Sequence, residues 1–372
     1  MSRTLCLSIL AVSMAAGCSS SSSHHSTGAP GGDKPTKPDT TDTPDSSTGA
    51  SSDASVDKDM EYMDIDEGTF TVPPGGEVTW CVRIPIPEAF RGRTLGLMGW
   101  QSDLPKPTHH FFISYSQNAL DGSDIVPCNG TNGVEQASNL IGEFDPSVGV
   151  SKILFGAGVG KNEVRTDTGY GRILETTGSL VTNHHVLNTG TETVNMYGRF
   201  TLEVKDVSLV SHPMSPFTCG NPSISLPPGS TKEVTGTCTA PFDMDIALMS
   251  SHAHARLTKV ETRFYDGQQT QPDVLYTSDQ WDSPKLQIMA NAPLTPLHVL
   301  AGQGLTFTCY YQNTTDHTIN YGLSANDEMC LTFNGYAYPA DRTFEVPPML
   351  STFTAGTTPA MVQDSTNSSF FF

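Results

Sequence analysis

Residues 68–87 read GTFTVPPGGEVTWCVRIPIP, and this stretch carries the pattern that decides the fold class. Two short runs rich in Val, Thr, Ile and aromatic residues flank the turn sequence PPGG, which is typical of two strands joined by a tight connection. Similar runs recur along the chain between Gly, Pro, Asn and Asp residues, at 108–115, 178–187, 199–210, 285–294 and 305–313. Long helical periodicity is scarce, so the sequence predicts an all-β protein of sandwich type.

The chain is long enough for two such sandwiches. LEVKDVSLVSHP, residues 202–213, ends one set of strand-like runs and begins another. We therefore expect two tandem β-sandwich, jelly-roll-like domains over residues 60–204 and 205–346, with a cleft between them and a polar tail over 347–372. Each half has an ordinary size for a sandwich domain.

The N-terminal region is expected to direct export rather than to fold. Residues 1–18 contain one early arginine, a short apolar run and AAGC, which resembles a bacterial lipobox in which Cys18 carries the lipid. Residues 19–59 are mostly Ser, Thr, Gly, Pro and Asp, a composition that predicts a disordered linker. No later apolar stretch is long enough for a transmembrane helix. We expect an exported protein, lipid-anchored to the cell envelope at the outer membrane.

Charge and cysteine usage agree with this expectation. Lys and Arg number 20 against 39 Asp and Glu, a formal net charge of −19, which argues against nucleic acid or an anionic membrane surface as a partner. An even number of cysteines remains in the expected folded region, which in an exported chain predicts three disulfides. Pairing between sequence neighbours is the first expectation, among Cys81, Cys128, Cys219, Cys238, Cys309 and Cys330.

Paired histidines are the candidate metal ligands. In SSHAHARL, residues 250–257, His252 and His254 would project from one face of a strand, because side chains alternate with a period of two. His109 and His110 are adjacent, so both reach one ion only at a strand end or a bulge. The adjacent pair at 184–185 should supply one ligand at most. The alternative for each group is a set of ordinary surface histidines.

Met329 lies beside Cys330 in the sequence DEMC, residues 327–330. A methionine next to a cysteine is usually core packing. A thioether together with two imidazoles would nevertheless suit Cu(I), and three imidazoles suit copper in either oxidation state.

These motifs, in this order, resemble the ascorbate-dependent copper type II monooxygenases, the family that includes dopamine β-hydroxylase and the peptidylglycine α-hydroxylating enzyme. EVTWCVRIPIP is similar to the family's opening Tyr-Trp-Cys strand, YGRIL to the run before its third ligand, and TCYYQNTTD to its Cys-x-Tyr-Asn segment. The resemblance covers roughly residues 62–342 and implies a disulfide between Cys309 and Cys330.

The resemblance also implies the ligand sets and the chemistry. His109, His110 and His185 would hold the first copper, which stores and delivers electrons across a solvent-filled cleft. His252, His254 and Met329 would hold the second, catalytic copper, where O2 and the substrate C–H bond meet. The implied activity is hydroxylation of a small organic substrate with O2 and a one-electron reductant such as ascorbate as co-substrate.

Departures from the family pattern restrict the substrate. The peptide-amidating members hold a carboxylate with Arg, Asn and Tyr residues at positions that are Ser250, Leu331 and Phe333 here. A peptide glycine carboxylate is therefore a poor candidate, and DEMC is closer to the amine-hydroxylating branch. The alternatives are a copper-capture lipoprotein with the same ligands and no catalysis, and an adhesive sandwich without metal.

Overall fold

A computed structural model gives the fold of the chain. It describes residues 57–120, 124–128, 134–136, 151–166, 169–322, 324–339, 350–354, 359–361 and 363–364. The expected signal segment, Cys18 and nearly all of the expected linker lie outside these residues. Within them the protein is all-β, with two single-turn 3₁₀ helices, η1 (Glu88–Phe90) and η5 (Val207–Leu209), so the predicted fold class is confirmed. No helix among these residues has the length and apolarity that a membrane crossing requires.

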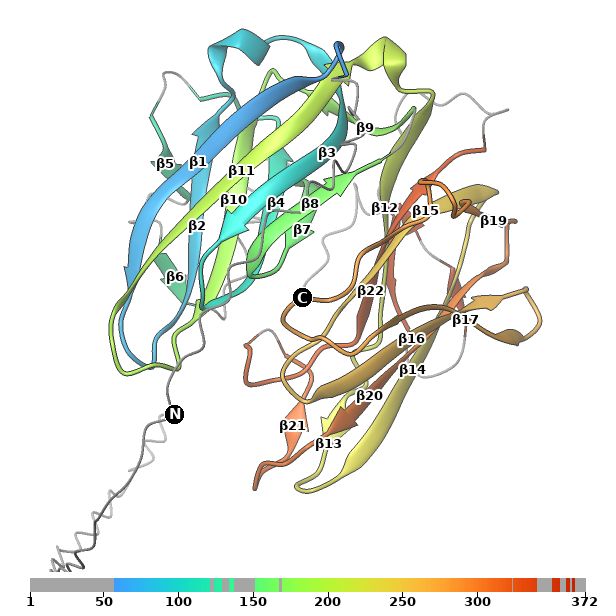
Figure 1. The fold of residues 1–372 in the computed structure, drawn as a ribbon. Coiled ribbons are helices and arrows are strands. Elements are labelled where there is room, and N and C mark those ends of the chain that lie inside the picture. The colour runs from blue at the N-terminus through green and yellow to red at the C-terminus, as the bar shows by residue number, and fades with distance from the viewer. Residues whose placement is uncertain are drawn as a thin grey trace, which may run out of the picture. The chain divides into compact units, whose positions relative to one another are not determined.

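The first half of the described chain forms two sheets, drawn from blue to green in Figure 1. One sheet has the order β1-β11-β3-β9, with β8 beside β3, and the other has the order β5-β2-β10-β4-β7, with β6 beside β2. The strands are β1 (Glu61–Val72), β2 (Glu77–Pro85), β3 (Thr94–Leu104), β4 (Thr108–Ser116), β5 (Val126–Pro127), β6 (Val134–Gln136), β7 (Ser151–Ala157), β8 (Gly160–Arg165), β9 (Tyr170–Glu175), β10 (Ser179–Leu187) and β11 (Val194–Asp206).

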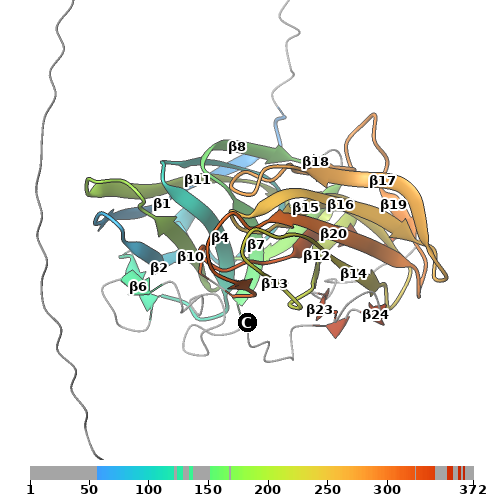
Figure 2. The same cartoon turned by 90° about the horizontal axis from the view of Figure 1, so that it is seen from below.

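The second half repeats the two-sheet arrangement. One sheet contains β12-β22-β15-β18, and the other contains β17-β16-β20-β14-β24, whose longer strands lie side by side in Figures 1 and 2. The strands are β12 (His212–Gly220), β13 (Ser225–Leu226), β14 (Thr231–Thr239), β15 (Met244–His252), β16 (Leu257–Tyr265), β17 (Thr270–Ser278), β18 (Gln287–Ile288), β19 (Leu297–Val299), β20 (Gly304–Gln312), β21 (Ile319–Asn320), β22 (Leu331–Ala337), β23 (Leu350–Phe353), β24 (Ala360–Met361) and β25 (Gln363–Asp364).

Each half buries its own apolar core between its two sheets. In the first half, alternate residues of β1 such as Met63 and Ile65 pack against Phe111 and Leu180 from the opposite sheet. In the second half, Phe217 and Phe307 belong to a separate cluster. Alternation of buried and exposed positions along β1 is the expected signature of a sheet with one face in a core.

The two halves share one sheet through a parallel pair between β9 and β12, in which Tyr170 lies opposite His212. The expected boundary near residue 205 falls at the end of β11, while β12 is still paired to the first half. In the expected C-terminal tail, β23 pairs in parallel with β12 from Phe217 to Gly220. The described part of that tail therefore adds a strand to the second half.

Three disulfides form within single halves: Cys81–Cys128, Cys219–Cys238 and Cys309–Cys330. Each links cysteines that are neighbours in sequence, so the predicted disulfides are confirmed. Cys81 lies in β2 and Cys219 lies in β12, and both cysteines are buried.

Candidate copper site

The first histidine group comes from two neighbouring strands, β4 and β10. His185 pairs in register with His110, whereas the next pair joins Val186 to Thr108. His109 is therefore the extra residue of a β-bulge. A bulge is one of the two places where adjacent strand residues such as His109 and His110 can face the same ion. One nitrogen from each of His109, His110 and His185 lies within 4.8 Å of the others.

Glu77 orients His185. The Nε2 of His185 lies 2.9 Å from a carboxylate oxygen of Glu77, so this nitrogen donates and Nδ1 keeps its lone pair. Burial alone would raise the pKa of Glu77, but hydrogen bonds from His185, the Ala325 N–H and the Ser324 hydroxyl outweigh it and lower the pKa to about 2. Glu77 is thus an ionised partner behind a candidate metal ligand.

His184, the neighbour of His185, is fully buried and faces the core of the first half. Its Nδ1 lies 2.5 Å from a Glu67 carboxylate oxygen and its Nε2 lies 2.7 Å from the Thr108 hydroxyl. Both nitrogens are therefore engaged, and its ring packs edge-on against Phe70 and Phe111. This geometry supports His185 rather than His184 as the third ligand.

The second histidine group lies where β15 ends. We expected His252 and His254 in one continuous strand, but β15 stops at His252. The reason is local: the backbone N–H groups of His254 and Arg256 donate to the buried carboxylate of Glu328 instead of to a neighbouring strand. Both rings still face each other, with centroids 5.2 Å apart.

Glu328 is a buried structural carboxylate. Glu328 is 0% exposed, so it is not a solvated turn acid. Desolvation raises the pKa of Glu328 to about 7, against the effect of the two N–H donors from Arg256 and His254. Its role is to hold the turn that carries His254.

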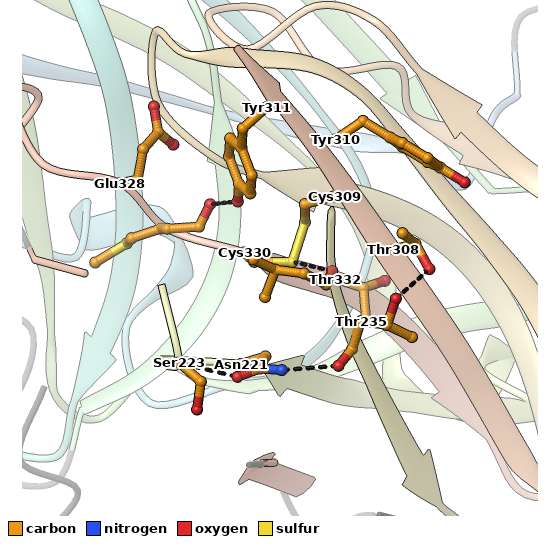
Figure 3. Close-up of a disulfide and its surroundings, with 12 residues drawn as sticks. Asn221, Ser223, Thr235, Thr308, Cys309, Tyr310, Tyr311, Glu328, Cys330 and Thr332 are labelled. Carbon is orange, nitrogen blue, oxygen red and sulfur yellow. Dashed lines mark hydrogen bonds between the residues drawn. A yellow bond between two sulfur atoms is a disulfide. The ribbon is translucent and has the colours of Figure 1, made fainter. Parts of the chain in front are cut away.

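Met329 is buried beside this turn. Leu331, the first residue of β22, pairs with His252, the last residue of β15, and Met329 lies two residues before Leu331. The Tyr311 hydroxyl donates to the Met329 carbonyl over 2.5 Å, next to the Cys309–Cys330 disulfide. Figure 3 shows Tyr311 and Cys309, both from β20, beside the segment from Glu328 to Cys330. β20 therefore holds this segment at two points, through the Tyr311 hydroxyl and through the Cys309–Cys330 disulfide.

The two histidine groups form one cluster. The His109 ring centroid lies 5.1 Å from that of His254, and the His110 centroid lies 5.4 Å from that of His252. The family resemblance implied two sites separated by solvent, whereas here the imidazoles of both halves are in contact. Glu77 of the first half also accepts hydrogen bonds from the second half, at Ser324 Oγ and Ala325 N.

The buried imidazoles are suited to hold metal ions. His109 Nε2, both nitrogens of His110 and His254 Nε2 have no hydrogen-bond partner, although buried nitrogens normally do. The Nδ1 atoms of His109 and His185 lie 3.1 Å apart, close to the ~3.3 Å that two ligands of one tetrahedral ion would adopt.

Burial also favours the neutral, metal-binding form of these rings. Desolvation lowers the pKa of His109, His110 and His252 below the usual value of 6.5, and it lowers the pKa of His254 to about 4. The other described histidines outside the cluster lie elsewhere: His212 stacks on Tyr170, His298 contacts Asp245, and His317 contacts Asp316.

A cavity of about 460 Å³ adjoins the cluster and is lined from both halves. His109, His110 and His252 form part of its wall. Aromatic and aliphatic side chains form most of the remainder, including Trp100, Phe112, Leu248, Trp281 and Phe333. A second hollow of about 640 Å³, over β1, β3, β8 and β11, is lined mainly by polar and charged residues and contains none of these histidines.

Sequence reasoning missed Glu77, Trp281 and Arg172. Glu77 is separated from His185 by 108 positions. Trp281 lies on a connection between strands, and its ring centroid is 5.5 Å from that of His109. No local pattern marks either residue. The only available signal for Glu77 was its place at the start of a strand that pairs with β10.

The fold and the site define a class: an all-β protein with a buried cluster of imidazoles, suited to bind metal, where its two halves meet. Residues 214–346 match the family model of the copper type II ascorbate-dependent monooxygenase, C-terminal domain. This stretch begins in β12 and contains His252, His254 and Met329, so the family resemblance is confirmed for the second half of the chain.

Solved structures with some similarity include the major capsid protein P2 from bacteriophage PM2, with 9% identity and a TM-score of 0.30, covering 77% of this chain and 100% of that one. A Sulfolobus turreted icosahedral virus chain has 10% identity and a TM-score of 0.22, with coverage of 76% and 61%. PNGF-II has 8% identity and a TM-score of 0.29, with coverage of 78% and 67%. These values carry no functional argument.

Proposed function

We propose that this protein is a copper-dependent monooxygenase that hydroxylates a C–H bond of a small organic substrate, using O2 and a one-electron reductant such as ascorbate. The observation that carries the proposal is a cluster of five buried histidines, His109, His110, His185, His252 and His254, three of which, His109, His110 and His252, line a largely apolar cavity. The match of residues 214–346 to the monooxygenase C-terminal domain supports the same activity.

His109, His110 and His185 would hold the first copper. His252, His254 and Met329 would hold the second. Bound copper would supply one-electron redox chemistry and the reactivity toward O2 that no side chain provides. The overall balance is one substrate C–H bond, one O2, two electrons and two protons, giving a C–OH bond and one water.

The chain's own residues have three roles in this proposal. Glu77 keeps a proton on His185 Nε2, so that Nδ1 faces the ligand position. Glu328 fixes the turn that presents His254. The apolar cavity wall binds the substrate beside the histidines and limits bulk water there, which favours coupling of electron delivery to hydroxylation.

Copper capture without catalysis would use the same ligands. The cavity favours an enzyme, because a protein that only stores copper has no need of a space for an organic molecule beside its ligands.

The proposal also includes export and lipid attachment at Cys18, which would tether the folded part to the envelope. Loss of metabolic lipid labelling in Cys18→Ser would support that attachment, and unchanged labelling would refute it.

The test of the activity is copper stoichiometry and ascorbate-dependent O2 uptake by the purified protein. Met329→Leu removes the thioether and keeps the volume, and Met249→Leu in the buried core of the same half is the matched control. The proposal expects copper-dependent uptake in the wild type and the control, and strongly reduced uptake in Met329→Leu. Copper binding without uptake across a panel of C–H substrates would indicate capture, and absence of copper binding would refute the ligand assignment.

A further inference from the structure

Arg172 lines the same cavity as the histidines, yet it comes from a different part of the fold. It lies on β9, paired opposite Leu97 of β3. One guanidinium nitrogen donates to the Leu154 carbonyl over 2.5 Å. Leu154, Trp100 and Phe155 line the same cavity, and so does a second cation, Lys161.

No acid neutralises Arg172 within the part of the chain that the structure describes. Glu163 and Asp282 line the cavity, and neither forms an ion pair with Arg172. By contrast, Arg165 nearby on β8 pairs with Glu203. Desolvation lowers the pKa of Arg172 to about 10, and no neighbouring charge opposes it. The guanidinium nevertheless stays charged at neutral pH.

An unpaired cation in an apolar cavity is costly, because the charge loses hydration without a compensating partner. Such groups are retained where a ligand supplies the opposite charge. A planar guanidinium matches the two oxygens of a carboxylate. The aromatic wall of the cavity, with Trp100, Trp281 and Phe333, suits an apolar body attached to that group.

We propose that Arg172 binds the anionic group of the substrate, and that the substrate class is small carboxylates with an apolar, aromatic-sized body. The claim that the bound carboxylate is hydroxylated rests on the proposed function. The claim that Arg172 binds a carboxylate does not. It disfavours an amine, whose ammonium group Arg172 would repel. The proposed anion site differs from that of the peptide-amidating enzymes, whose carboxylate-binding positions are Ser250, Leu331 and Phe333 here and include no cation. Those positions belong to the second half, whereas Arg172 belongs to the first half.

The test uses three probes of one shape, 3-phenylpropionate, 3-phenylpropanol and 3-phenylpropylamine. Binding is measured by calorimetry, and by the fluorescence of Trp100 and Trp281, without reductant so that no turnover occurs. Arg172→Met removes the charge, Arg172→Lys keeps it without the planar fork, and Arg199→Gln on the outer face of β11 is the control. Copper stoichiometry and circular dichroism verify that each variant is folded.

We expect the wild type and the control to bind the carboxylate more tightly than the alcohol, and the amine least. In Arg172→Met, carboxylate binding should weaken by about 30-fold or more, while alcohol binding changes little. Arg172→Lys should recover part of the carboxylate preference. If Arg172→Met fails to fold, Arg172→Lys decides: carboxylate affinity equal to that of the wild type would refute bidentate recognition.

Equal affinity for the carboxylate in wild type and a folded Arg172→Met, or preference for the amine, would overturn the inference. The two proposals fail separately. Arg172-dependent carboxylate binding with no O2 uptake would refute the monooxygenase and leave the ligand class standing. Copper-dependent hydroxylation that is indifferent to Arg172→Met would refute the ligand class and leave the enzyme standing.

Discussion

Substitution of the two adjacent histidines of β10, one at a time, should separate a structural role from a metal-binding role. His184→Ala leaves the fully buried Glu67 carboxylate without its partner, at a cost of about 3–5 kcal/mol in the free energy of unfolding. The lost hydrogen bond to Thr108 adds about 1 kcal/mol. For a protein of this size each kcal/mol lowers the melting temperature by about 2–4 °C, so we expect a decrease of about 10 °C or more.

His185→Ala should behave in the opposite way. Glu77 would keep its hydrogen bonds from Ser324 and Ala325 and some contact with solvent, so the melting temperature of the copper-free protein should fall much less. Copper bound per chain should fall, because one ligand of the first group is lost. Thermal scanning of copper-free protein and metal analysis at 4 °C measure both quantities. Full copper binding by His185→Ala, or copper loss in a folded His184→Ala, would refute the assignment.

Three further predictions follow from other contacts. Glu77→Gln should weaken copper binding at the first histidine group by about 10-fold or more, measured by competition with a chelator, because the ionised partner of His185 is lost. Replacing both Cys309 and Cys330 by serine should lower the free energy of unfolding by about 3 kcal/mol in denaturant titration, from the loop of 21 residues that the disulfide closes. Hydrogen bonding from Lys259 lowers the pKa of Glu261 below its usual 4.5, so its stabilising contribution is complete above pH 4.5 and is lost as the pH falls; Glu261→Gln should flatten the acid limb of a melting-temperature profile.

The prediction for Glu77→Gln has a matched control, and each of the three predictions has an outcome that would contradict it. Glu88→Gln changes an exposed carboxylate far from the histidines and should leave copper affinity unchanged. An undiminished affinity in Glu77→Gln would show that the Glu77 contact has no influence on the metal. An unchanged denaturant midpoint after loss of the Cys309–Cys330 disulfide would contradict the loop-entropy argument. An unaltered acid limb in Glu261→Gln would show that the ion pairs of Glu261 do not stabilise the protein.

Local patterns in the sequence predicted most of the fold. Runs rich in Val, Thr, Ile and aromatic residues, the turn sequence before β2 and the even cysteine count are features that a chain encodes locally. The adjacent histidines at 109–110 implied a strand end or a bulge if both bind one ion, and β4 has a bulge there. The H-x-H pattern overextended β15 by two residues, because the competing acceptor, Glu328, comes from a distant turn.

The parts of the site that sequence reasoning missed depend on contacts between distant segments. Glu77 and Ser324 are 247 positions apart, and nothing near either residue indicates that they meet. The same holds for the contact between His109 and His254, which requires the two halves to be docked. Arg172 reads as an ordinary strand residue in YGRIL, and only the fold shows that it lines the cavity and forms no ion pair with an acid among the described residues.

The pairing of the cysteines has a consequence for how the chain matures. A polypeptide that emerges N-terminus first presents Cys81 and Cys128 together before any cysteine of the second half is available. Cys219 and Cys238 follow as the next two, and Cys309 and Cys330 come last. Oxidation in order of emergence therefore yields the native bonds directly. Such a chain needs an oxidant as it emerges, but it has little need of an enzyme that reshuffles wrong pairs.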